Sequence, residues 1–224
     1  MSSTTSTAAA PREKRFLLAR AEARALTWIA ERVPRRVMPD HLTALGVLAA
    51  VGIAAAYVLS NGDRAWLWAA SALLVVHWLG DSLDGTLARV RRAERPRYGY
   101  YVDHLADAVA TALVGLGLGL SGYMHLAVAL TLVIAYLALS VNSYLETQAL
   151  GRFTLGYGRL GPTEARILLV VVLVALALGA HLALLSLTLL DVVCLGAAAV
   201  MLVAGGARAL GNRRQLAARE PYAA

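Results

Sequence analysis

The chain has 224 residues, of which 59% are hydrophobic, and its mean hydropathy is +0.62. Soluble domains are far less apolar, so the composition excludes an ordinary soluble protein and predicts a polytopic membrane protein built as one helical bundle. The net charge of +7 does not indicate nucleic-acid binding, because the basic residues flank apolar segments, where they set topology and contact anionic lipid. Cys194 is the single cysteine, which excludes an intrachain disulfide.

The N-terminal part is polar and charged. Residues 1–11 are mostly Ser, Thr and Ala, and we expect them to be disordered. Residues 12–36 hold eight basic and three acidic residues, and this pattern predicts a juxtamembrane amphipathic helix lying in the headgroup region. A helix that packs on another part of the protein is the alternative. The apolar stripe of this helix, at helical spacing, consists of Phe16, Leu17, Ala21, Ala25, Trp28, Ile29 and Val33.

Six apolar segments follow, and they predict six transmembrane helices within residues 37–207. Residues 208–224 are expected to form a basic cytoplasmic tail. The predicted fold is therefore all-α, a six-helix membrane bundle preceded by the amphipathic helix. The expected spans are residues 41–59, 100–120, 124–148, 163–180 and 187–204, together with a second span that starts near residue 65 and runs into the segment at 81–85.

The distribution of Lys and Arg predicts the orientation in the membrane. With six spans, 20 of the 21 basic residues lie on one side, and only Arg64 lies opposite. The side with the excess of positive charge is expected to be cytoplasmic, with both termini inside.

Residues 81–107, which read DSLDGTLARVRRAERPRYGYYVDHLAD, contain two pairs of aspartates. Asp81 and Asp84 are three apart, and Asp103 and Asp107 are four apart, so each pair lies on one face of a helix. The residues between, 89–98, include five arginines and predict a basic turn. Two helices joined by that turn would bring four carboxylates together near the cytoplasmic surface. Such a cluster repels itself unless it binds cations or keeps protons.

Carboxylate oxygens are hard ligands that suit Mg²⁺ or Mn²⁺, and cations held in this way commonly bind a di- or triphosphate. The histidines are scattered and predict no zinc site; His104 adjoins Asp103 but points elsewhere on a helix. Gly85 and Ala88 leave room for a ligand, and the guanidinium of Arg89 suits phosphate oxygens. Small residues at this spacing also serve helix packing, but together with the acids they favour a ligand site.

These residues resemble the signature of the CDP-alcohol phosphatidyltransferase family, D-x-x-D-G-x-x-A-R followed by a spacer and G-x-x-x-D-x-x-x-D. The spacer here, residues 90–98, is one residue longer than is usual. The signature covers 27 residues, and the expected six-span topology agrees with the family over most of the chain. The matched positions are Asp81, Asp84, Gly85, Ala88, Arg89, Gly99, Asp103 and Asp107.

The resemblance implies a transferase of phospholipid biosynthesis that moves a phosphatidyl group from a CDP-linked lipid, foremost CDP-diacylglycerol, to an alcohol acceptor and releases CMP. It implies two divalent cations, Mg²⁺ or Mn²⁺, held by the four aspartates, with Asp107 also acting as the general base. It also suggests a homodimer, and it likens residues 39–43 to a segment near the nucleotide. The residues implied to contact the CDP moiety are Gly85, Ala88 and Arg89.

The acceptor pocket is expected near the loop before the fifth span. Family members with phosphorylated acceptors carry arginines there, so the resemblance implies that Arg152 or Arg166 holds an acceptor phosphate; arginines that only set topology are the alternative. A divalent-cation transporter using the same aspartates is the competing function, and a catalytically silent scaffold is a third. A transport path needs polar residues near the midplane of several helices, whereas here they cluster at one membrane face.

Overall fold

A computed structural model describes residues 19–151, 162–179, 183–184 and 187–220. This part of the chain is all-helical apart from two paired strands of two residues each. Residues 1–18, and with them the segment expected to be disordered, lie outside it. The elements are α1 (Ala19–Ala30), α2 (Pro39–Leu59), α3 (Trp66–Val90), α4 (Pro96–Gly119), α5 (Leu126–Leu150), α6 (Pro162–Ala177), β1 (Ala183–Leu184), β2 (Leu187–Thr188) and α7 (Leu189–Arg219).

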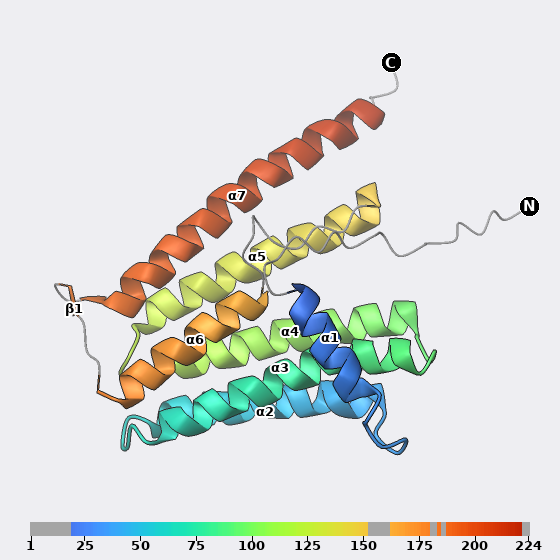
Figure 1. The fold of residues 1–224 in the computed structure, drawn as a ribbon. Coiled ribbons are helices and arrows are strands. Elements are labelled where there is room, and N and C mark those ends of the chain that lie inside the picture. Colours follow the sequence, from blue (N-terminus) through green and yellow to red (C-terminus); the bar gives the residue numbers. More distant parts are fainter. Residues whose placement is uncertain (1–18, 152–161, 180–182, 185–186, 221–224) are drawn as a thin grey trace, which may run out of the picture.

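The helices form one bundle with a projecting arm. Helix α2 packs against both α3 and α4, α6 packs on α3, and α1 crosses α3 (Figure 1). Helix α4 contacts α5, and α5 in turn carries α7, so that α7 leans away from α2 and α3 (Figure 1). The α3–α4 turn therefore lies at the same end of the bundle as the C-terminal ends of α5 and α7.

Among the described residues, four helices are long and apolar enough to cross a bilayer: α2, α4, α5 and α7. The prediction of six spans is thus met in part. Helix α3 has 25 residues, but its tryptophans, His77 and the aspartates lower its hydropathy. Helix α6 is apolar but has only 16 residues. The four apolar helices fit an integral membrane protein.

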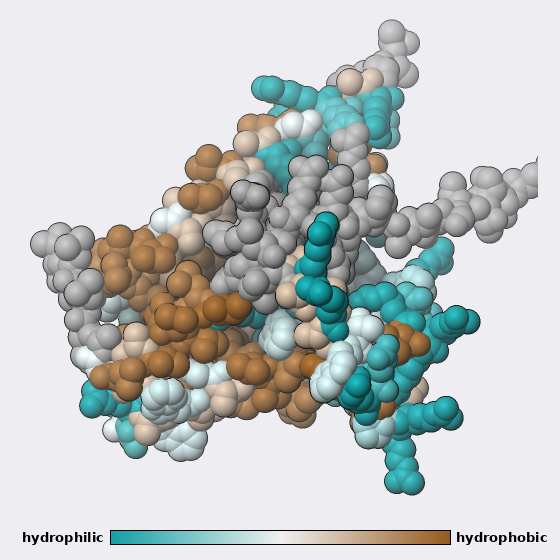
Figure 2. Space-filling view, in the orientation of Figure 1, coloured by the Kyte–Doolittle hydropathy of each residue, from teal (hydrophilic) through white to brown (hydrophobic). Residues whose placement is uncertain are grey.

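The surface agrees with this assignment. Large apolar side chains are exposed on the sides of the spans, among them Leu48 at 68%, Ile134 at 63% and Val203 at 73%. Figure 2 shows hydrophobic residues covering the flank of the bundle, whereas hydrophilic residues gather around α1 and at the C-terminal end of α7. Apolar area of this extent marks a surface that is covered by lipid or protein.

Several boundaries differ from the sequence-based expectation; α1, expected to continue to residue 36, ends at Ala30, and α6, expected to continue to residue 180, ends at Ala177. Helix α3 continues to Val90, so Arg89 is helical and the turn to α4 is shorter than expected. Within this turn Arg92 adopts a left-handed backbone conformation, with φ of 52°. Helix α4 begins at Pro96; the first N–H groups of a helix have no intrahelical partner, so the N–H that proline lacks is not missed there. Helix α7 runs to Arg219, so the expected tail at residues 208–224 is largely a continuation of that helix.

Glycines bring α2 and α3 together just before the first aspartate. A Cβ at Gly80 would lie 2.7 Å from the Leu42 carbonyl oxygen and 2.8 Å from the Gly46 nitrogen. No other residue fits this crossing without moving backbone. His77 adds a hydrogen bond of 3.0 Å between its Nδ1 and the Gly46 carbonyl oxygen. This crossing sets where α3 presents Asp81.

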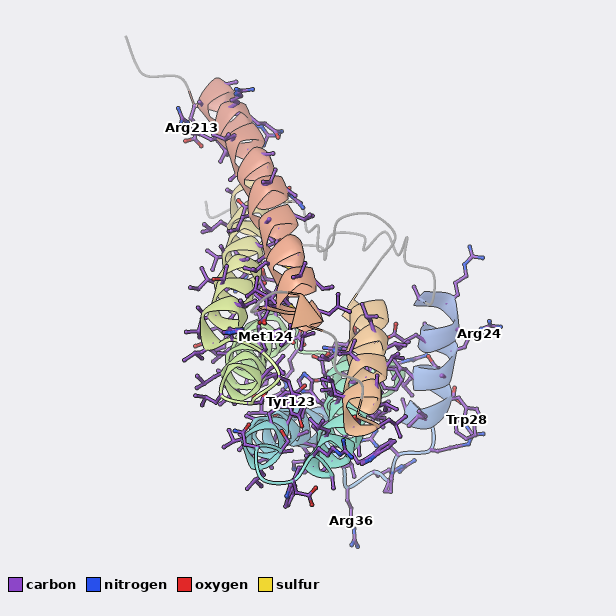
Figure 3. The ribbon with its side chains drawn as sticks, turned by 90° about the vertical axis from the view of Figure 1, so that its left-hand side faces the viewer. Arg24, Trp28, Arg36, Tyr123, Met124 and Arg213 are labelled. Atoms are coloured by element: carbon purple, nitrogen blue, oxygen red, sulfur yellow. The ribbon has the colours of Figure 1, made fainter. Side chains whose placement is uncertain are left out.

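Helix α1 packs on the bundle. Its Leu26 and Ala30 are buried in a cluster with residues of α2 and α3, and Trp78 Nε1 donates to Glu22 Oε1 at 3.2 Å. Of the predicted apolar stripe, Ile29 packs in this cluster, whereas Trp28 is 57% exposed and projects away from the bundle (Figure 3). The alternative of packing on the protein is therefore realised for part of the stripe.

A hydrogen-bonded network joins α5 and α7 at the end of the bundle remote from the α3–α4 turn. Asp191, fully buried in the first turn of α7, accepts from the backbone N–H of His125 at 2.9 Å and from Thr188 Oγ1 at 2.8 Å. The sequence analysis assigned Asp191 no function, and in the structure it caps α7 and ties it to α5.

Candidate active site

Three of the four signature aspartates face one small cavity between α2, α3 and α4. Its volume is about 10 Å³, which is enough for one water molecule. The chain reverses at the short α3–α4 turn, and Asp81 of the first pair lies with both aspartates of the second pair. The residues that line the cavity are Thr43, Gly46, Val47, His77, Asp81, Asp103, Ala106 and Asp107.

Asp107 lies deepest along α4 and has acidic neighbours on two helices. Its carboxyl group lies beside those of Asp81 and Asp103, close enough to Asp81 for a hydrogen bond between the two groups. Carboxylates this close repel each other unless a proton or a cation lies between them. Asp81, Asp103 and Asp107 therefore share one site, and Asp84 lies at its edge.

Asp84 is held by its own hydrogen bonds at the edge of this cluster. It is 8% exposed, and its Oδ2 accepts from Thr43 Oγ1 of α2 at 2.5 Å. Its other oxygen accepts from the backbone N–H of Gly85 at 2.5 Å. Asp81 and Asp103 are within electrostatic range of this carboxyl group. Thr43 lies in the 39–43 segment that the resemblance connects with the nucleotide.

Arg166 of α6 reaches the same cluster. Its Nη2 donates to Asp81 Oδ2 at 2.7 Å, and both side chains are largely covered. Arg166 is one of the two arginines expected to hold an acceptor phosphate, and the structure places it beside the aspartates. Arg152, the other arginine expected there, lies outside the described residues.

The chemistry of the donor set fits hard divalent cations. The carboxyl groups of Asp81, Asp103 and Asp107 converge from two helices, and carboxylate oxygens are the ligands such cations prefer. Within the described residues, however, no three acidic, histidine or cysteine side chains are arranged to enclose one ion. Arg166 already donates a hydrogen bond to one oxygen of Asp81, and Thr43 donates one to an oxygen of Asp84. These contacts would have to rearrange to admit cations.

The residues expected to contact a nucleotide lie on the last turns of α3. Gly85 is partly exposed, and a Cβ there would lie 3.4 Å from Arg89 Nη1, so a side chain would compete with the guanidinium for space. Arg89 is exposed, and its Nη2 donates to Thr86 Oγ1 at 2.9 Å. Ala88 is partly buried on the same stretch.

A polar clamp joins the start of α2 to the start of α4 beside these turns. Arg95 donates to Asp40 Oδ1 at 2.5 Å, and its guanidinium lies 3.9 Å from the centre of the Tyr98 ring. The hydrogen bond from Arg95 to Asp40 raises the pKa of Arg95 above its usual value. Arg91 anchors the loop between α1 and α2 by donating to the carbonyl oxygens of Val37 and Pro34, at 2.5 and 2.9 Å.

Two side-chain contacts with α5 were not apparent from the sequence. His104 is buried and stacks on Tyr144 of α5, with ring centroids 4.4 Å apart; its Nδ1 also lies 3.4 Å from Asp103 Oδ2, so the ring does not point away from that aspartate. Arg208 of α7 pairs with Glu146 of α5 at 2.6 Å, and both side chains are mostly buried. The pairing of Arg208 with Glu146 could have been suggested only by recognising that α7 continues as a helix beyond its apolar part.

Residues 36–204 match the family described as CDP-alcohol phosphatidyltransferase, which is well over half of the chain. A comparison with curated proteins gave no match.

Proposed function

Because the chain belongs to the CDP-alcohol phosphatidyltransferase family, whose members transfer substituted phosphate groups, we propose that it uses CDP-diacylglycerol as donor. In this proposal the phosphatidyl group passes to an alcohol acceptor and CMP is released, as a step of phospholipid biosynthesis. The family supports the transfer from a CDP-alcohol, and the choice of donor and acceptor is our own inference. The observation that supports a metal-assisted phosphoryl transfer at this site is the convergence of Asp81, Asp103 and Asp107 on one cavity.

The four aspartates are proposed to hold two divalent cations, Mg²⁺ or Mn²⁺. When bound, such cations grip the donor pyrophosphate and offset the negative charge that develops during phosphoryl transfer. Asp81 and Asp107, already in mutual contact, supply ligands from α3 and α4. Asp103 adds a third carboxylate, and Thr43 holds Asp84 in orientation.

Asp107 is proposed as the general base. It takes the proton of the acceptor hydroxyl, whose oxygen then forms a bond to the phosphorus that bears the lipid alcohol. The bond from that phosphorus to CMP breaks, and CMP leaves with the electron pair. A positioned base of this kind typically contributes about 10²- to 10⁴-fold to the rate.

Binding of the substrates is assigned to two sides of the cavity. Gly85 and Ala88 leave space along α3 for the CDP moiety, and the exposed guanidinium of Arg89 is free to turn toward its phosphates. Arg166, and Arg152 by sequence, are proposed to hold a phosphate on the acceptor.

The membrane arrangement is also a proposal. With α3 and α6 counted as spans, the bundle has six transmembrane helices, and the basic end that carries the α3–α4 turn is cytoplasmic. The gathering of hydrophilic residues at one end supports this orientation (Figure 2). Helix α1 would lie at that surface with Trp28 and Arg24 toward lipid headgroups. The family resemblance suggests a homodimer.

A divalent-cation transporter is the alternative that the same aspartates allow. A transport path requires polar groups near the midplane of several helices, whereas these acids lie in the C-terminal half of α3 and the N-terminal half of α4, toward the α3–α4 turn. Arg166 at Asp81 would also repel a passing cation.

One experiment separates the two functions. The purified full-length protein, reconstituted in liposomes, is supplied with CDP-diacylglycerol, Mg²⁺ and a panel of acceptor alcohols, and released CMP and the lipid product are measured. We expect acceptor-dependent CMP release with one member of the panel and no Mn²⁺ flux. Flux of Mn²⁺ without any CMP release would contradict the proposal.

A further inference from the structure

Arg166 supplies a positive charge from the protein itself to the acidic cluster. Its guanidinium donates to Asp81 at 2.7 Å, and the two side chains are only 23% and 21% exposed. Asp107 and His77 also lie within its electrostatic range. A partly buried ion pair of this kind is stronger than a surface pair, because little water screens it.

The position of this guanidinium conflicts with that of a divalent cation. Both would use the carboxylate of Asp81, and two positive charges sharing one carboxylate repel strongly in a site with little water. The cavity has a volume of about 10 Å³, which is far too small for two cations and a pyrophosphate. Arg166 pairs with Asp81 from beside the cavity, and its side chain has several rotatable bonds, so it can move at low cost.

We propose that Arg166 is a positioning residue that competes with divalent cations for Asp81. The inference rests on the proposed metal-binding function of the aspartates. The guanidinium balances the charge of the acids and fixes α6 against α3. With Asp81 engaged by a divalent cation, Arg166 would be released and its guanidinium would be available to an anionic phosphate of the substrates.

The test is a titration of the full-length protein with Mn²⁺, in which free Mn²⁺ is followed by electron paramagnetic resonance. We expect Arg166→Gln to bind Mn²⁺ about 10-fold more tightly than the wild type, equivalent to about 1.4 kcal/mol. Arg89→Gln is the matched control, since it removes the same charge from an arginine that, within the described part of the chain, donates to Thr86 and to no acid. Its affinity should change by less than about twofold.

The outcomes separate this inference from the proposed function. Equal or weaker Mn²⁺ binding by Arg166→Gln, or equal tightening by Arg89→Gln, would overturn the competition while leaving the metal site in place. A wild-type protein that binds no Mn²⁺ would overturn both.

A second measurement uses the wild type and does not depend on the folding of a variant. Arginines are labelled with phenylglyoxal, with and without Mn²⁺, and the label on the peptide that contains Arg166 is quantified by mass spectrometry. We expect Mn²⁺ to increase the labelling of Arg166 several-fold and to leave that of Arg32, an exposed arginine of the α1–α2 loop, unchanged. Constant labelling of Arg166 would overturn the inference.

Discussion

The Gly80→Ala substitution tests whether the crossing of α2 and α3 positions the acidic site. The new Cβ would lie 2.7 Å from the Leu42 carbonyl oxygen, whereas ordinary contacts begin at 3.4 Å. The helices must therefore separate by the difference, about 0.7 Å, because the opposing atoms are backbone. Asp81 follows directly on the chain and would move with α3 relative to Thr43 of α2.

This displacement is expected to reduce both the reaction rate and the stability of the protein. Misplacing catalytic groups by about 1 Å reduces rates by about 10²-fold, so we expect CMP release to fall about 10- to 100-fold. Overpacking should also lower the free energy of unfolding by about 1–3 kcal/mol, which a thermal melt in detergent would detect.

Gly196→Ala in α7 is the matched control for this substitution. Nothing lies within 4 Å of a Cβ at Gly196, so the substitution should leave activity unchanged and stabilise the helix by about 0.5–1 kcal/mol. Activity and melting temperature of Gly80→Ala equal to those of the wild type would refute the positioning of Asp81 by the crossing.

Three further predictions concern the site and the far end of the bundle. Asp107→Asn should abolish CMP release while leaving nucleotide binding largely intact, because the amide cannot accept the proton; normal turnover would refute its assignment as the base. EDTA should silence the enzyme, and Mg²⁺ or Mn²⁺ should restore it, because the carboxylates need cations to hold a pyrophosphate; full activity in chelator would exclude the metal. Asp191→Ala should lower the free energy of unfolding by about 1–3 kcal/mol, since His125 and Thr188 lose a buried acceptor, and an unchanged thermal melt would contradict its structural function.

The sequence predicted the parts of this protein that depend on local spacing and composition. Apolar segments of sufficient length identified the membrane helices, four of which meet that criterion in the structure. The i, i+3 and i, i+4 spacing of the aspartates predicted that α3 and α4 each present a pair on one face, and in the structure Asp81 shares a cavity with Asp103 and Asp107 whereas Asp84 lies at its edge. The signature, which is local as well, predicted the family that residues 36–204 confirm.

The long-range contacts of the site could not be read from the sequence. Arg166 is 85 positions from Asp81 and Thr43 is 41 from Asp84, and no local pattern pairs residues so far apart. The interfacial prediction for α1 rested on one amphipathic stripe, which does not reveal whether lipid or α3 covers it. Spacing along a helix fixes which side chains share a face, whereas the packing of backbone at Gly46 and Gly80 decides what that face meets.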